Sequence, residues 1–292
     1  MGFIMMLAIQ IILIVVLTPL VGGLLAGFDR IISARVQGRK GPPLLQPFYD
    51  VLKLLQKENI QVNKTYKFYV YVSLLFIILT AVIMLIGGDI LLAIFVLTLG
   101  AIFFVFGGYA SQSPYSIIGA ERELLQMMAY EPMVLITAAG LYMVSKTFFI
   151  GEIIARDVPA IVYLPAVFIG FVYILTFKLR KSPFDLSLGH HAHQELVQGI
   201  STEYSGTELA VIEITHWYET IISLVFVYIF FVTSNPISHV FAIIACIVVY
   251  LFEIILDNST VRVKWQLALK SAWIVTGVLS IMNLMILSFF KF

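Results

Sequence analysis

Long apolar runs alternate with polar connections along the whole chain. Each run has about 20 residues, the length that an α-helix needs to cross the hydrocarbon core of a bilayer. The ten-residue alternating segments of a membrane β-barrel do not occur in the sequence. The eight predicted spans are about 3–27, 66–87, 90–111, 123–144, 160–178, 207–232, 239–256 and 268–290. The pattern therefore predicts an all-α, multi-pass membrane protein whose residues 1–292 form a single integral membrane domain.

Basic residues gather on one side of the predicted helix bundle. Of the 18 Lys and Arg residues, all except Lys146, Arg156 and Lys291 fall in or beside the connections that follow the first, third, fifth and seventh spans. An excess of Lys and Arg marks cytoplasmic connections, so we expect these connections to be cytoplasmic and both termini to face out of the cell. Their predicted bounds are about 28–65, 112–122, 179–206 and 257–267.

The first cytoplasmic connection contains a short amphipathic segment. Residues 47–57 place Phe48, Val51, Leu52 and Leu55 at helical spacing, with basic residues facing the other way. The segment is too short to span, so we expect a helix that lies in the membrane interface.

Composition limits the chemistry that the chain performs alone. The chain is 61% hydrophobic and 12% charged, whereas soluble domains are about 25% charged. Its one cysteine, Cys246, lies inside a predicted span, so cysteine ligands for an iron–sulfur cluster or a zinc ion must come from another subunit. The basic residues are dispersed at the membrane surface, which gives nucleic-acid binding no support.

Two acidic residues of the fourth span are candidates for an ion path. Glu123 lies at the inner boundary, where interfacial charge and a pair with Arg122 are the favoured interpretation and a path residue is the alternative. Glu131 is eight residues further, about 12 Å deeper in a helix. Because carboxylates are costly within a bilayer, we expect Glu131 to have a function, with a structural hydrogen bond as the alternative.

The sixth span carries four ionisable residues in one half of its helix. With Glu208 at 0°, the helical period places Glu219 at about 20°, His216 at about 80° and Glu213 at about 140°. Such a stripe favours a polar path that faces the bundle interior.

The connection before this span is rich in histidine. His190, His191 and His193 precede Glu195 and Glu203. Adjacent histidines in a loop are a poor arrangement for zinc, so we expect no metal site and favour partner contacts or proton exchange.

Two further acidic residues, Glu253 and Asp257, lie one helical turn apart near the inner end of the seventh span. Basic residues Arg262 and Lys264 follow them. A surface cluster of ion pairs explains this arrangement, and a docking patch for a partner is the alternative.

Several strings of the sequence resemble one known family. These strings are Arg35-Val36-Gln37-Gly38-Arg39-Lys40-Gly41-Pro42, Leu45-Gln46-Pro47, Glu195-Leu196, Thr202-Glu203-Tyr204-Ser205-Gly206 and Arg262-Val263-Lys264-Trp265. In this order, and with eight spans, they resemble the membrane subunit of respiratory complex I that forms the quinone chamber. The resemblance covers nearly the whole chain.

Departures from the quinone-type pattern point to a subgroup. The connection through Pro43-Leu44 is about six residues shorter, a histidine run replaces part of an acidic string, and His216 stands where a glutamate is usual. These features look like the counterpart subunit of archaeal membrane-bound hydrogenases and of the membrane-bound sulfane reductase, which take electrons from ferredoxin. The shortened connection disfavours a quinone tunnel.

The resemblance implies a membrane-anchoring and energy-coupling subunit of an oxidoreductase complex, with no catalysis by this chain alone. It implies iron–sulfur clusters, and in a hydrogenase a nickel–iron centre, in partner subunits rather than in this chain. The implied partners are hydrogenase-like large and small subunits on the cytoplasmic face and antiporter-like subunits in the membrane. The expected ion or proton path comprises Glu123, Glu131, Glu195, Glu203, Glu208, Glu213, His216 and Glu219. The expected docking residues are Arg35, Arg39, Lys40, His190, His191, His193, Arg262 and Lys264.

Three hypotheses follow from the sequence. The favoured one is a coupling subunit of a ferredoxin-linked hydrogenase or sulfane reductase. The second is the quinone-chamber subunit of a quinone-reducing complex I. The third is a stand-alone secondary transporter, for which inverted repeats with broken helices are expected. Carboxylates bind both protons and sodium ions, so the sequence leaves the translocated ion open.

Overall fold

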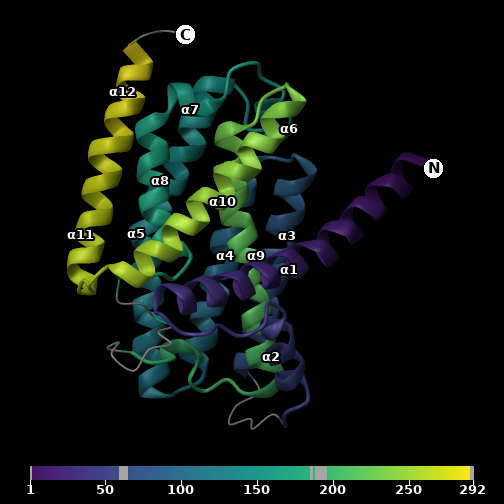
Figure 1. Ribbon diagram of the computed structural model, residues 1–292, viewed down its shortest axis with the longest axis vertical. Helices are drawn as coiled ribbons and strands as arrows, with labels where there is room; N and C mark the ends of the chain where they lie inside the picture. Colours follow the sequence, from purple (N-terminus) through teal and green to yellow (C-terminus); the bar gives the residue numbers. More distant parts are fainter. Residues whose placement is uncertain (1, 59–64, 185–186, 188–195, 290–292) are drawn as a thin grey trace. The chain divides into compact units, whose positions relative to one another are not determined.

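In the computed structural model (Figure 1) the chain folds into helices joined by short connections. The structure describes residues 2–58, 65–184, 187 and 196–289. The helices are α1 (Gly2–Val36), α2 (Gln46–Leu55), α3 (Thr65–Ile86), α4 (Ile90–Ala110), α5 (Pro114–Ser145), α6 (Ile150–Ile154), α7 (Ala160–Tyr163), α8 (Pro165–Lys178), the 3-10 turn η1 (Gly199–Ser201), α9 (Gly206–Phe231), α10 (Pro236–Ser259), α11 (Trp265–Val275), the π-helical segment η2 (Thr276–Ile281) and α12 (Met282–Phe289). The predicted all-α fold is confirmed.

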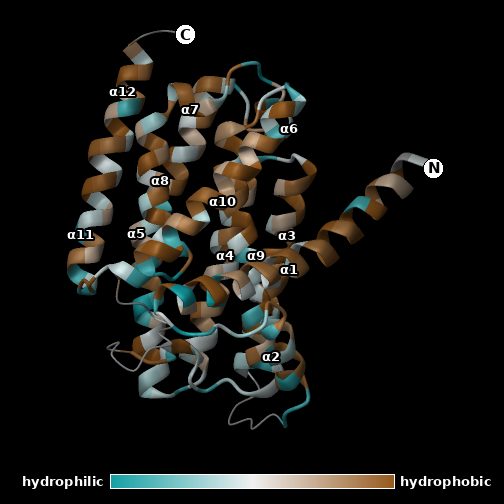
Figure 2. Ribbon diagram, viewed as in Figure 1, coloured by the Kyte–Doolittle hydropathy of each residue, from teal (hydrophilic) through white to brown (hydrophobic). Residues whose placement is uncertain are grey.

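Among the residues that the structure describes, seven helical segments are long and apolar enough to cross a membrane. They are α1 from Ile4 onward, α3, α4, α5, α9, α10 and the continuous segment Trp265–Phe289. In Figure 2 hydrophobic residues cover most of the length of α3, α10 and α12. The predicted fifth span, 160–178, is instead broken into α7 and the 14-residue α8. Pro165 begins α8, because proline suits a first helical turn and disrupts a helix interior.

Two helices extend well beyond their predicted ends. Helix α1 continues to Val36, nine residues past its predicted end at 27, and α5 begins at Pro114 rather than at 123. The predicted cytoplasmic connections 28–65 and 112–122 are therefore partly helical. Hydropathy finds where a helix leaves the bilayer, but the helix itself continues in water as long as its backbone bonds and packing persist.

The chain divides into two compact units. The first comprises Met1–Val82, Val96–Leu125 and Asp185–Ile221, and the second comprises Ile83–Phe95, Gln126–Phe184 and Ile222–Phe292. Helices α3, α4, α5 and α9 each have residues in both units. A single integral membrane domain stays a prediction.

In the first unit the amphipathic helix α2 packs against α1 and α9. The rings of Phe48 and Trp217 lie 5.1 Å apart, and Val51 is buried with Ala210 and Trp217. The amphipathic helix is thus confirmed, although its predicted apolar face is divided. Leu52 and Leu55 are exposed, so this part of the face remains available to the membrane interface.

In the second unit α8 packs against the rod formed by α11, η2 and α12, and Figure 1 shows the two side by side. The side chain of Asn283 accepts hydrogen bonds from the backbone N–H groups of Ala166 (3.1 Å) and Val167 (3.3 Å) and donates to the carbonyl of Tyr163 (3.2 Å). A helix end inside a membrane leaves backbone groups that must find partners in the protein. Asn283 supplies them where the fifth span is broken.

Candidate functional site

Residues 196–205, which precede α9, are packed into the first unit. Leu196, Ile200 and Tyr204 are buried. The Tyr115 hydroxyl donates to the carbonyl of Val197 (3.0 Å) and accepts from its N–H (2.7 Å). This half of the predicted connection 179–206 is therefore not an exposed loop.

Glycines allow this segment to approach α5 closely. A Cβ atom at Gly119 would lie 2.2 Å from the backbone nitrogen of Ile200, and one at Gly199 would lie 2.0 Å from the carbonyl oxygen of Ser187. Side chains larger than hydrogen do not fit either position without a backbone shift. The glycines thus hold Ser187 next to the start of α5.

The packing places Ser187 against a predicted path residue. Glu123 is buried in α5 and accepts a hydrogen bond from the Ser187 hydroxyl. Glu123 is predicted at the inner boundary, and its side chain is buried there. A buried carboxylate needs such a donor to offset the loss of its hydration.

An ion pair joins the beginnings of α3 and α9. The ammonium group of Lys67 lies 3.1 Å from the carboxylate of Glu208. The Glu208 side chain is 1% exposed and that of Lys67 is 36% exposed, so the pair connects a buried acid to a partly solvent-exposed base. Glu208 therefore faces the protein interior, as its place in the predicted stripe requires.

Two tyrosines lie beside this pair. The ring of Tyr66, the residue before Lys67, makes an edge contact with the ring of Tyr204 at 5.0 Å. The Tyr204 hydroxyl is buried and has no hydrogen-bond partner among the described residues. Burial raises the pKa of this hydroxyl, and the neighbouring Tyr66 adds to the effect. A Cβ at Gly107 would approach the same hydroxyl to 2.5 Å, so glycine is needed there.

The other predicted residues of the α9 stripe are half-buried. His216 makes an edge contact with the ring of Phe104 on α4, 6.3 Å between ring centres. Glu213 and Glu219 lie on the same helix, and Glu203 lies just before it. These residues belong to the first unit. Glu131 belongs to the second unit, is half-buried, and precedes Pro132 in an unbroken α5. A continuous path through all of them stays a prediction.

The predicted docking residues differ in their exposure. Arg35, Arg39, Lys40 and Lys264 are exposed, whereas Arg262 is half-buried. His190, His191, His193 and Glu195 lie outside the described residues. Among the residues that the structure describes, no group of three or more His, Cys, Asp or Glu side chains could hold a metal ion.

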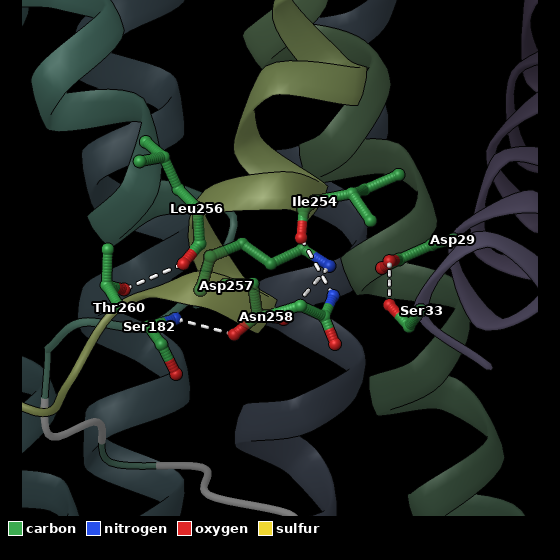
Figure 3. Close-up of polar contacts among 9 residues, drawn as sticks. Asp29, Ser33, Ser182, Ile254, Leu256, Asp257, Asn258 and Thr260 are labelled. Atoms are coloured by element: carbon green, nitrogen blue, oxygen red, sulfur yellow. Dashed lines mark hydrogen bonds and ion pairs between the residues drawn. The ribbon is translucent and has the colours of Figure 1, made fainter. Parts of the chain in front are cut away.

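The predicted surface cluster around Glu253 and Asp257 is wrong for Glu253, which is completely buried. Asp257 points toward the connection after α8, where its carboxylate accepts the N–H of Ser182 at 2.8 Å (Figure 3). Lys181 lies 3.6 Å from the same carboxylate. Helix α10 packs against α8 in this unit, a contact that the charge pattern alone does not reveal.

Sequence reasoning missed Lys67, Ser187 and Tyr204 as neighbours of the candidate path. The charge pattern identifies Lys67 only as a basic residue of a cytoplasmic connection. A signal was present, because Lys67 and Glu208 both lie at the predicted inner ends of spans, at similar depth. Nothing in the local pattern indicated that α3 and α9 are neighbours.

The fold and the site together define a membrane subunit of the type found in complex I-related oxidoreductases. Residues 8–288 match the family model described as NADH dehydrogenase, and the chain belongs to this family. It is 27% identical to formate hydrogenlyase subunit 4 of Escherichia coli, over 87% of this chain and 90% of that protein. It is 30% identical to a subunit of the NADH-quinone oxidoreductase of Geobacter metallireducens, over 73% of each chain.

A solved structure shares the fold over nearly the full length. A chain in the structure of the membrane-bound sulfane sulfur reductase, an archaeal respiratory membrane complex, superposes with a TM-score of 0.83 and 25% identity. The match covers 95% of this chain and 99% of that chain. The chain is therefore a membrane subunit of a multi-subunit, complex I-related respiratory complex, as the resemblance of its motifs predicted.

Proposed function

We propose that the chain anchors a cytoplasmic redox arm to the membrane and couples ferredoxin-linked electron transfer to the translocation of protons or sodium ions. The similarity to the sulfane reductase chain and to formate hydrogenlyase subunit 4 supports a complex of this kind. The redox centres, iron–sulfur clusters and in a hydrogenase a nickel–iron centre, belong to the partner subunits. Both termini face out of the cell, and antiporter-like subunits adjoin the chain in the membrane.

The observation that carries this proposal is the ion pair between Lys67 and Glu208. Ionisable side chains buried in membrane helices are costly and mark ion or proton pathways by default. Glu208 is sealed from solvent, whereas Lys67 on α3 remains partly exposed. The pair therefore connects the partly exposed start of α3 to the buried end of the α9 stripe.

The basic residues around the end of α1 support docking of a partner. Arg35, Arg39 and Lys40 are exposed, and the turn that carries them is held in place. The N–H of Arg39 bonds to the carbonyl of Ala34 at 2.9 Å. An exposed cluster of positive charge on a fixed turn suits an acidic surface of a soluble subunit.

Two measurements test the proposal. Mass spectrometry of the complex that co-purifies with this chain should find hydrogenase-like large and small subunits. In inverted membrane vesicles driven by reduced ferredoxin, Glu208→Gln should leave assembly and electron input intact and lower the number of ions moved per electron several-fold. Glu131→Gln should do the same, and Glu152→Gln, at an exposed carboxyl of α6, is the matched control. Unchanged ion translocation in Glu208→Gln contradicts the coupling role.

A quinone-chamber subunit of a quinone-reducing complex I is the second candidate. The 30% identity to an NADH-quinone oxidoreductase subunit favours it. It predicts that the purified complex reduces quinone analogues and that quinone-site inhibitors stop this activity. The third hypothesis, a stand-alone transporter, predicts ion flux when this chain alone is placed in lipid vesicles.

A further inference from the structure

The second unit also contains a buried carboxyl. Glu253 on α10 is completely buried, and among the described residues neither of its oxygens has a hydrogen-bond partner. Buried polar side chains are satisfied in nearly all native proteins, and an exception calls for an explanation. A carboxylate without hydrogen bonds is costly to bury, and the neutral acid is less so.

The surroundings of Glu253 contain one base and one further acid. Lys181 and Asp257 are the charged groups among the described residues whose fields act on the Glu253 carboxyl. Asp257 follows Glu253 by four residues, so both side chains lie on the same face of α10, about 6 Å apart along its axis. Lys181 comes from the connection after α8 and is nearly buried beside Asp257.

Lys181 occupies a position from which it can serve either acid. Its ammonium group lies 3.6 Å from the Asp257 carboxylate, longer than a direct hydrogen bond. The same carboxylate also accepts a hydrogen bond from the N–H of Ser182 at 2.8 Å. Asp257 therefore keeps a hydrogen bond when the ammonium group leaves. The flexible four-carbon stem of a lysine reaches across one helical turn.

The backbone on both sides of this cluster is fixed. The N–H of Val263 bonds to the carbonyl of Pro183 at 2.6 Å, and Phe184 stacks on Phe177 at 3.8 Å. The connections after α8 and after α10 are thus joined close to Lys181, whose side chain is the flexible group of this cluster.

We propose that Glu253 is a proton-binding site of the coupling machinery and that Lys181 is its movable counter-ion. In the resting state Glu253 holds its proton and Lys181 pairs with Asp257. When Glu253 releases the proton to water at the inner face, the Lys181 ammonium group turns to the Glu253 carboxylate, and it returns when a proton is bound again. No electrons are exchanged, and the proton is the only group transferred.

A proton fits this site better than a sodium ion. Hard metal cations require several oxygen ligands, whereas Glu253 and Asp257 share the ammonium ion of Lys181, which repels a second cation. The neutral acid, in contrast, needs no further ligand. The inference rests on the proposed coupling function and adds a site in the second unit to it.

The first test measures the number of ions moved per electron in the intact complex. Glu253→Gln reproduces the shape of the neutral acid and removes its proton, so we expect normal assembly and electron input with a several-fold loss of translocation. Glu253→Asp, which retains the exchangeable proton, should restore part of it. Glu152→Gln is the control. Full translocation in Glu253→Gln overturns the inference and identifies Glu253 as a structural residue.

The second test does not depend on activity. Dicyclohexylcarbodiimide reacts with protonated carboxyls in apolar surroundings, and mass spectrometry of the intact complex locates the adduct. Labelling of Glu253 should fall as the pH rises, and in Lys181→Met it should persist to a pH higher by about one unit or more, because the counter-ion is lost. Lys181→Arg should restore the original profile. A labelling profile that does not move in Lys181→Met overturns the inference even where Glu253→Gln fails to assemble.

These outcomes also separate the inference from the function on which it rests. If translocation is impaired in Glu208→Gln but complete in Glu253→Gln, the proton site at Glu253 is rejected and the coupling function stands. If translocation is complete in both variants, the proposed coupling function is rejected as well.

Discussion

A glycine in α1 allows a test of the packing that holds the connection between α1 and α2. A Cβ atom at Gly27 would lie 2.0 Å from the carbonyl oxygen of Leu44, whereas ordinary contacts begin at 3.4 Å. The Leu44 backbone must therefore move by about 1.4 Å, since a carbonyl oxygen has no rotamer into which it can turn. Leu44 belongs to the shortened connection that separates this chain from the quinone-type pattern.

The expected cost follows from two opposing effects. Overpacking costs about 1–3 kcal/mol, and a backbone shift of this size lies toward the upper end. Replacing a helical glycine with alanine contributes about 1 kcal/mol of stability. We therefore expect Gly27→Ala to destabilise the protein by about 2 kcal/mol, which corresponds to a fall of about 4–8 °C in the thermal midpoint at the scale of soluble domains.

A matched control lies elsewhere in the membrane part of the chain. A Cβ at Gly277, also in a helical segment, would meet no atom within 4 Å. Gly277→Ala should therefore leave the midpoint unchanged or raise it slightly. Thermal unfolding of the purified complex in detergent, followed by near-ultraviolet circular dichroism, measures both variants. Equal midpoints for the two variants would refute the argument that the Leu44 backbone presses against α1.

Three further predictions concern the connections that the sequence predicts to be cytoplasmic. Burial alone would raise the pKa of Asp50, but its hydrogen bonds, chiefly from Arg30, outweigh burial and lower this pKa in the folded protein. The Asp50 carboxylate therefore stabilises the fold above its unfolded pKa. This contribution disappears as the pH falls through the pKa of the folded state. Both side chains are over a third exposed, so Arg30→Gln should cost less than about 1 kcal/mol at neutral pH and should make acid titration of stability shallower. Tyr115→Phe removes both hydrogen bonds to Val197 and should cost about 1–2 kcal/mol and speed amide exchange in the segment after Val197, as hydrogen-exchange mass spectrometry would show; unchanged exchange contradicts it. A cysteine introduced by Lys40→Cys should react with an impermeant maleimide in inverted vesicles from which the soluble subunits have been stripped. Reaction only in right-side-out vesicles would reverse the predicted orientation.

Local patterns determined the parts of this protein that depend only on neighbours in sequence. Apolar runs of span length identified the long helices, because the bilayer requires that many apolar residues in each. Helical spacing identified α2, and the same period placed Glu208 on an inward face. These signals are local, so no knowledge of the neighbouring helices was needed.

Only the tertiary structure decided what each polar side chain meets. The pairing of Lys67 with Glu208 joins residues far apart in sequence, and the complete burial of Glu253 results from packing that hydropathy does not register. The break in the fifth span is sustained by Asn283, which lies over a hundred residues away. Such contacts depend on which helices become neighbours, and a periodicity along one helix carries no information about the helix that covers it.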